Sequence, residues 1–289
     1  METQNYSCLA RTDPKIVPID QYKNIKDCQE SIGKEWIHSI IFTSILFVLI
    51  GTYVLCQYED RPHYHWCTAP LRGFNSMTAW TAIWLLALSL LPGTLTKLVK
   101  RIYGPQKNVN AVLLWGIGIR KNLGLLGLYF LFIHVCMMLL LYNSSYYNHI
   151  FGRRGKTMDS WRYEWTMFMA VISTSFFIIV GISSLPGVAL KMNKAQWQAI
   201  FGILVWWALV TGLLHVIFLG GDDWDEDENS SPYAWARGMP PVTLMASLIP
   251  LLVLFFKFVS MTLARLTRLN ALAKRGSELG SVHPHPESA

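Results

Sequence analysis

Charged residues are scarce in this sequence: Asp, Glu, Lys and Arg together make up 15% of its 289 residues, whereas hydrophobic residues make up 52%. Soluble domains carry about 25% charged residues, so this deficit argues against a water-soluble protein. A helix needs roughly 20 apolar residues to cross a bilayer, and six segments reach about that length. They are residues 36–57, 77–98, 122–143, 165–185, 198–220 and 240–262. We therefore predict an all-α membrane protein with six transmembrane helices.

The sequence also lacks room for a soluble nucleotide-binding domain. We expect a polar arm at residues 1–35, a transmembrane domain at 36–269 and a flexible polar tail at 270–289. A dinucleotide-binding fold needs repeated strand-turn-helix units, which neither terminal segment can hold. The nearest glycine motif, Gly116-Ile-Gly118, lacks its third glycine and follows no convincing strand. No small-residue cleavage site follows the first span, so we expect that span to be retained rather than removed as a signal peptide.

Cysteine is too sparse and too scattered for a disulfide framework. Of the five cysteines, Cys8 and Cys28 are expected on the reducing side of the membrane and Cys136 within the third span. Cys56 and Cys67 flank the first outer loop and are the pair that could form a bridge. Two unpaired thiols are an equally open interpretation.

The basic residues are distributed unevenly between the two sides of the predicted membrane. With a cytosolic N-terminus, 18 of the 25 Lys and Arg residues fall in cytosolic segments. Basic residues near helix ends resist translocation. The outer loops then contain both Asn-Ser-Ser sequons, at Asn143 and Asn229, which need lumenal or extracellular exposure for glycosylation. Both patterns predict cytosolic termini, and the net charge of +7 is spread over four segments rather than gathered into a nucleic-acid-binding patch.

Ionisable side chains are costly inside hydrocarbon, and two histidines lie well inside the apolar segments, away from their ends. His134 lies in the third span and His215 in the fifth, two helices expected to run in the same direction. At 1.5 Å per residue, His134 lies about 18 Å above Asn122 and His215 about 25 Å above Gln198, so both fall in the outer half. Two histidines at similar depth suit axial ligation of one b-type haem. An interhelical hydrogen bond made by each histidine is the alternative.

Six short motifs form an ordered series along the chain. They are Leu91-Pro92-Gly93, Arg120-Lys121-Asn122-Leu123-Gly124-Leu125-Leu126, Trp161-Arg162-Tyr163-Glu164, Ser184-Leu185-Pro186-Gly187-Val188, Met239-Pro240-Pro241 and Ile249-Pro250. The series resembles that of the six-transmembrane epithelial antigen of the prostate (STEAP) metalloreductase family over most of residues 35–277. The interval from Pro186 to His215 matches the family without an insertion, while Asn122 replaces a glutamine. An ordered series of this kind is more specific than any one of its motifs.

The resemblance implies a ferric-reductase-like bundle that transfers electrons across the membrane. His134 and His215 take the role of axial ligands to a single haem b. Family members also bind FAD near the inner membrane face, between the haem and a cytosolic NADPH-binding domain, and reduce ferric or cupric ions outside. Residues 1–35 are too few to hold that domain, so we expect a chain without it, as in one branch of the family. Because members assemble as trimers, the resemblance implies a partner that oxidises NADPH, in the plasma membrane or an endosomal membrane.

The resemblance also implies flavin contacts at the inner end of the bundle. The charges of Arg120 and Lys121 suit a pyrophosphate, and Asn122 and Gln198 are candidates to hydrogen-bond the flavin ring. The positive-inside pattern explains the two basic residues equally well without a ligand.

Other features leave different functions open. Lys194 and Phe201 replace a tryptophan and a glutamine of the family, which lowers the expected flavin affinity. An alternative function is therefore that of a catalytically inactive adaptor subunit that forms trimers with active relatives. Arg153 and Arg154 are candidates to attract an anionic metal chelate on the outer side. A transporter is disfavoured because the sequence contains neither internal repeats nor paired intramembrane charges.

Overall fold

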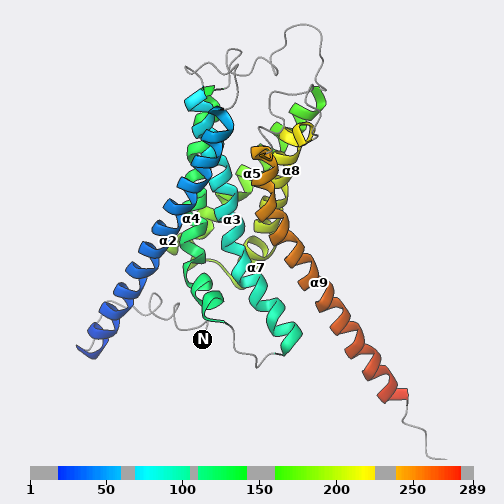
Figure 1. The fold of residues 1–289 in the computed structure, drawn as a ribbon. Helices are drawn as coiled ribbons and strands as arrows, with labels where there is room; N and C mark the ends of the chain where they lie inside the picture. Colours follow the sequence, from blue (N-terminus) through cyan, green and yellow to red (C-terminus); the bar gives the residue numbers. More distant parts are fainter. Residues whose placement is uncertain (1–18, 60–68, 105–109, 142–159, 225–238, 281–289) are drawn as a thin grey trace, which may run out of the picture.

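The computed structural model describes residues 19–59, 69–104, 110–141, 160–224 and 239–280, and the elements within these ranges are helices (Figure 1). The long helices are α2 (Ile19–Glu59), α3 (Ala69–Tyr103), α4 (Ala111–Leu141), α5 (Ser160–Ser183), α8 (Val205–Gly220) and α9 (Val242–Gly280). Between α5 and α8 lie α6 (Pro186–Ala189), α7 (Lys194–Ala199) and the π-helical turn η1 (Ile200–Leu204). A 3-10 turn, η2 (Gly221–Trp224), follows α8.

Six helical stretches are long and apolar enough to cross a membrane. They are Gly33–Gln57, Pro70–Tyr103, Ala111–Leu141, Glu164–Ser183, Lys194–Gly220 and Val242–Ala273. The prediction of an all-α bundle with six spans is therefore confirmed, and the chain is a multi-pass membrane protein.

The first and last long helices extend beyond their predicted spans. Helix α2 begins at Ile19, within the segment expected to be a polar arm, and α9 continues to Gly280, within the segment expected to be a flexible tail. Hydropathy detects only the part of a helix that suits hydrocarbon, whereas Leu, Ala, Arg, Lys and Glu all favour helix in any solvent. These residue types dominate the C-terminal part of α9, so the helix continues after its apolar part ends.

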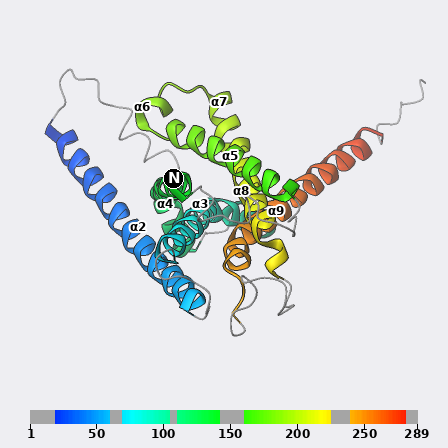
Figure 2. The ribbon, with the colours of Figure 1, turned by 90° about the horizontal axis from the view of Figure 1, so that it is seen from above.

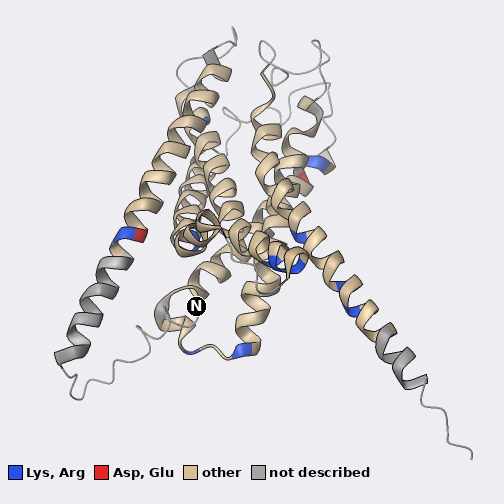
Figure 3. Ribbon diagram, turned by 60° about the horizontal axis from the view of Figure 1, so that its bottom comes forward, with Lys and Arg blue, Asp and Glu red and all other residues tan. Residues whose placement is uncertain are grey.

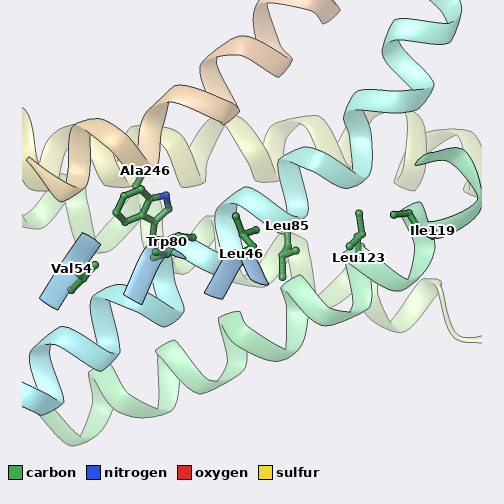
Figure 4. Close-up of a cluster of buried hydrophobic side chains, with 8 residues drawn as sticks. Leu46, Val54, Trp80, Leu85, Ile119, Leu123 and Ala246 are labelled. Carbon is green, nitrogen blue, oxygen red and sulfur yellow. The ribbon is translucent and has the colours of Figure 1, made fainter. Parts of the chain in front are cut away.

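Helix α3 lies near the centre of the bundle, between the other long helices (Figure 2). It packs against α2, α4, α8 and α9, while the most extensive partner of α5 is α8. The largest buried apolar cluster joins α2, α3, α4 and α9 (Figure 4). Its members are Leu46, Ile50, Val54, Trp80, Leu85, Ile119, Leu123 and Ala246.

Hydrogen bonds attach the beginning of α9 to α2 and α3. Tyr53 Oη donates to the Pro240 carbonyl at 2.6 Å, and Gln57 Nε2 donates to the same oxygen at 2.5 Å. Trp84 Nε1 donates to the Ala246 carbonyl at 3.1 Å. Because hydrocarbon offers no water to hydrogen-bond, polar groups inside a membrane protein must find partners of this kind.

The bundle has apolar outer faces and an interior that includes small polar residues. Val48, Leu139 and Phe258 are 63%, 75% and 68% exposed, whereas Thr78 and Ser247 are completely buried. Small and hydroxyl-bearing residues favour close helix contacts in lipid, where apolar side chains gain little by leaving the surface. This distribution is the one expected of a bundle surrounded by lipid.

Most described Lys and Arg residues lie toward one end of the bundle (Figure 3). Lys100 and Arg101 occupy the last turn of α3, and Arg120 and Lys121 lie in the first half of α4. The N-terminal end of α2 and the C-terminal end of α9 extend from this same end (Figure 1). The arrangement agrees with the positive-inside pattern. That this end faces the cytosol stays a prediction.

Candidate functional site

His134 lies on α4 and makes a hydrogen bond to α3. Its Nδ1 is 2.8 Å from Asn75 Oδ1, and Asn75 is only 6% exposed. The amide nitrogen of Asn75 points to Met138, with Nδ2 3.1 Å from the Met138 sulfur. Since Met138 lies one helical turn beyond His134, Asn75 contacts two residues on one face of α4.

His215 lies on α8 and makes a corresponding hydrogen bond to α5. Its Nδ1 is 2.9 Å from the main-chain oxygen of Thr166. The two helices approach closely here because Gly212 has no side chain: a Cβ at that position would lie 2.9 Å from Ser173 Oγ. Ser173 Oγ in turn donates to the Ala208 carbonyl at 2.9 Å. Contacts between α5 and α8 therefore fix the position of the acceptor for His215.

The helices that carry His134 and His215 share two neighbours. Helix α3 packs against both α4 and α8, and α5 also packs against both. Within the described ranges, however, α4 and α8 themselves are not a closely packed pair. Helices α3 and α5 therefore connect the helix of His134 to the helix of His215.

The hydrogen bonds determine which ring nitrogen of each histidine can bind a metal. A main-chain carbonyl only accepts, so His215 must carry its proton on Nδ1 and present the Nε2 lone pair. Asn75 Oδ1 has the same effect on His134. Both hydrogen bonds join two helices, so they also agree with the alternative interpretation, in which each histidine only makes an interhelical hydrogen bond. Metal-binding histidines also normally donate their second N–H to a carbonyl or carboxylate, so the arrangement fits two axial ligands to a haem iron.

Thr166 provides a further indication that a polar group belongs at this site. Its side chain is 3% exposed, and its hydroxyl has no hydrogen-bond partner among the described residues. The same residue supplies the carbonyl that accepts from His215. Buried hydroxyl groups normally have a partner, so this one is suited to a ligand held beside His215.

Sequence reasoning did not identify Asn75 and Thr166. Asn75 precedes the predicted second span, which began at residue 77, but α3 already begins at Ala69. The one feature of the sequence that could have identified Asn75 is its place just before the apolar run that starts at residue 77. Thr166 acts through its main-chain oxygen, which no side-chain pattern can indicate.

The four residues proposed to contact flavin are only partly brought together. Arg120 and Lys121 are exposed on α4, next to the buried Asn122. Helix α4 begins at Ala111, so about two and a half turns precede Arg120, which lies further inside the helix than predicted. Gln198 is exposed on α7, and α7 and α4 are not a closely packed pair within the described part of the chain.

Two sequence motifs of the predicted inner half contact each other. A Cβ at Gly93 would lie 3.6 Å from Arg120 Nη1, so the guanidinium extends over the Pro92-Gly93 step of α3. A Cβ at Gly116 would lie 2.8 Å from Pro92 Cγ, which explains how α3 and α4 approach closely. The Leu91-Pro92-Gly93 motif of α3 and the motif that begins at Arg120 on α4 therefore lie side by side.

The beginning of the fifth span has its own defined structure. Asn193 and Gln196 form a reciprocal capping box that starts α7 at Lys194. Phe201, in the π-helical turn, packs against Trp197 with ring centroids 4.1 Å apart. The position that carries glutamine in the family is thus part of an aromatic pair here, and it cannot hydrogen-bond a flavin through its side chain.

The remaining predicted sites lie outside the described residues. They are the outer arginines Arg153 and Arg154, the sequons at Asn143 and Asn229, and Cys67, the partner considered for Cys56. Cys56 itself is exposed.

Comparison with known proteins gives a distant match to metalloreductases. The chain is 24% identical over 237 residues to metalloreductase STEAP2 of Homo sapiens, in an alignment that covers 75% of this chain and 47% of that protein. Metalloreductase STEAP2 of Mus musculus gives the same identity and coverage. No protein-family model matches the chain. The chain spans about half the length of the curated relatives it matches, and this distant similarity supports a metalloreductase-like family of transmembrane proteins.

Proposed function

We propose that the chain conducts electrons across a membrane through a single b-type haem bound by His134 and His215, to reduce ferric or cupric ions on the outer or lumenal face. The observation that carries the proposal is the matching arrangement of two imidazoles inside the membrane. Each one donates through Nδ1 to an acceptor on a neighbouring helix, which leaves its Nε2 lone pair to bind a metal. A haem held by the two Nε2 atoms would supply a one-electron carrier inside the hydrocarbon.

The protein's part in this function is to hold and insulate the two ligands. Asn75 and the Thr166 carbonyl orient the rings, so the lone pairs are directed before any metal binds. The histidines are partly buried among apolar helices, and a water-poor site of low dielectric constant affects the potential of a bound metal. Their predicted place in the outer half of the bilayer suits delivery to a metal ion outside.

Electron balance requires a donor that the described part of the chain does not contain. Each Fe³⁺ or Cu²⁺ ion gains one electron, while one NADPH loses two electrons to give NADP⁺ and a proton, so two metal ions are reduced per NADPH. FAD at the inner face supplies the conversion between two-electron and one-electron transfer when it is bound. We propose that a partner reductase in a homo- or hetero-trimer oxidises NADPH.

The test of the proposed function is the visible spectrum and the redox reaction of the purified protein. We expect about one low-spin b-type haem per chain, reducible by dithionite. We also expect the reduced protein to be reoxidised under anaerobic conditions by ferric citrate or a cupric salt. A wild-type protein that stays colourless after haem supplementation during expression would overturn the proposal.

The basic residues of α4 are proposed to bind the flavin phosphates. Replacing Arg120 and Lys121 together by alanine is expected to weaken FAD binding by about tenfold or more, because charge-assisted hydrogen bonds contribute about 1.5–3 kcal/mol. FAD titration of the haem-loaded protein measures the effect, and the haem content should not change. Arg265→Ala is a matched control, since Arg265 is an exposed basic residue on α9. Equal FAD affinity in the double variant and the control would remove these two residues from the flavin site.

A second candidate function is that of an adaptor subunit without catalysis of its own. The aromatic pair formed by Trp197 and Phe201, together with the exposure of Gln198 on α7, favours weak flavin binding. An adaptor would bind no FAD in isolation, fail to reduce metal ions with an NADPH-oxidising partner, and still form trimers with it. Arg153 and Arg154 belong to the catalytic proposal alone, as attractants for an anionic metal chelate.

A further inference from the structure

We infer that Asn75 is a positioning residue for the haem ligand His134, and that its amide oxygen sets how strongly this imidazole donates to the iron. The inference rests on the proposed function, because it concerns the bis-histidine site. Asn75 is not itself a ligand. It lies on α3, whereas the two ligands lie on α4 and α8, and it acts on the iron through His134.

The geometry of Asn75 leaves its amide a single satisfactory orientation. Oδ1 faces His134 Nδ1 at 2.8 Å, and Nδ2 faces the Met138 sulfur at 3.1 Å. The Met138 sulfur can only accept, so turning the amide over would place the amide oxygen against an atom that cannot donate to it. The main-chain oxygen of Asn75 also accepts from Thr78 Oγ1 at 2.9 Å. A buried amide with this set of partners is held rigidly.

The two ligands differ in the kind of acceptor that orients them. His215 donates to a main-chain carbonyl, whose strength no substitution of Thr166 changes directly. His134 donates to a side chain, so a single substitution can change its acceptor. A substitution of Asn75 can therefore change the reduction potential of a bound haem directly, whereas a substitution of Thr166 cannot.

The direction of that adjustment follows from the basicity of the imidazole. A stronger acceptor draws the Nδ1 proton away from the ring and makes Nε2 a better donor, which favours the ferric state and lowers the reduction potential. Removing the acceptor has the opposite effect. A residue that served packing alone would not shift the potential in opposite directions when replaced by a stronger acceptor and by none.

The test is a redox titration of the haem-loaded full chain with Asn75→Asp and Asn75→Leu, two replacements of similar shape. We expect Asp to lower and Leu to raise the midpoint potential, each by about a tenfold change in the ferric-to-ferrous equilibrium, equivalent to about 59 mV for one electron. Electron paramagnetic resonance of the ferric state should shift with them. Thr81→Val is the control, since Thr81 is buried on the same helix and its hydroxyl has no partner among the described residues.

Each result decides between the inference and its rejection. Opposite shifts, with Thr81→Val unchanged, support the role of Asn75, as does a haem-containing Asp variant of lowered potential when the Leu variant loses its haem. Shifts of one sign, or none, in variants that retain haem overturn it. Loss of haem from both variants, with Thr81→Val retaining it, also overturns the tuning role and leaves Asn75 a structural one. A wild-type chain without haem instead overturns the proposed function, so the two failures are distinguishable.

Discussion

Haem retention is expected to collapse when either histidine is removed. Purified His134→Ala and His215→Ala variants should each lose more than about 90% of the haem absorbance per chain, because losing even an outer-shell partner of a metal ligand lowers affinity roughly 10–100-fold. Each alanine removes the Nε2 lone pair itself, together with the Nδ1 donor that binds Asn75 Oδ1 or the Thr166 carbonyl. The measurement is the reduced-minus-oxidised spectrum normalised to protein, at matched expression.

A histidine elsewhere in the membrane provides the control for this experiment. His38 lies in the first span, with its ring 6.5 Å from that of Trp115, and it contacts neither ligand in the described structure. His38→Ala should keep its haem. Added imidazole, which matches the ring that each alanine removes, should partly restore the spectrum of either ligand variant. Full haem content in His134→Ala or His215→Ala would show that the replaced histidine is not a ligand.

The sequence was sufficient to predict the six spans, and it singled out His134 and His215 as candidate ligands, a role that stays a prediction. Long apolar runs identify membrane helices because hydrocarbon imposes the same requirement on every span. A histidine within such a run is conspicuous, as His134 and His215 were. Helix ends were less predictable: the charges of Arg120 and Lys121 interrupted the apolar run, whereas α4 continues back to Ala111.

The residues around the histidines depended on helix pairing, which hydropathy does not encode. Asn75 becomes relevant only because α3 packs against α4, and the Thr166 carbonyl only because α5 packs against α8. The same limitation affected the flavin site. Gln198 was grouped with Arg120 by the resemblance, yet the two lie on helices that are not closely packed within the described structure.

Glycines illustrate the same difference between sequence and packing. Gly124 and Gly127 occur in one short apolar stretch and equally suggest close helix contacts. A Cβ at Gly124 would lie 3.8 Å from Ser89 Oγ, which is an ordinary contact. A Cβ at Gly127 would lie 2.9 Å from Leu86 Cγ and 3.2 Å from the Leu86 main-chain nitrogen. Of these two glycines, Gly127 is therefore the one that brings the backbones of α3 and α4 together.

Gly127→Ala is accordingly expected to destabilise the bundle by about 1–3 kcal/mol, the usual consequence of adding a carbon to a well-packed interior. Leu86 is buried beside Phe177 and Ala208, so its side chain has little room to move, and its main-chain nitrogen cannot rotate away. The larger Gly127→Leu should abolish folding. Thermal unfolding of the detergent-purified protein, followed by fluorescence, measures the effect.

Gly124→Ala is the matched control, and it should be neutral or slightly stabilising because alanine favours helix over glycine by about 1 kcal/mol. Gly127 lies about two helical turns before His134 on the same face of α4, so forcing α4 away from α3 also separates His134 from Asn75. Gly127→Ala should therefore lose haem at a lower temperature than Gly124→Ala. Equal stability and equal haem retention in the two variants would show that α3 and α4 are not in close contact at Leu86, and that this contact does not hold His134 in place.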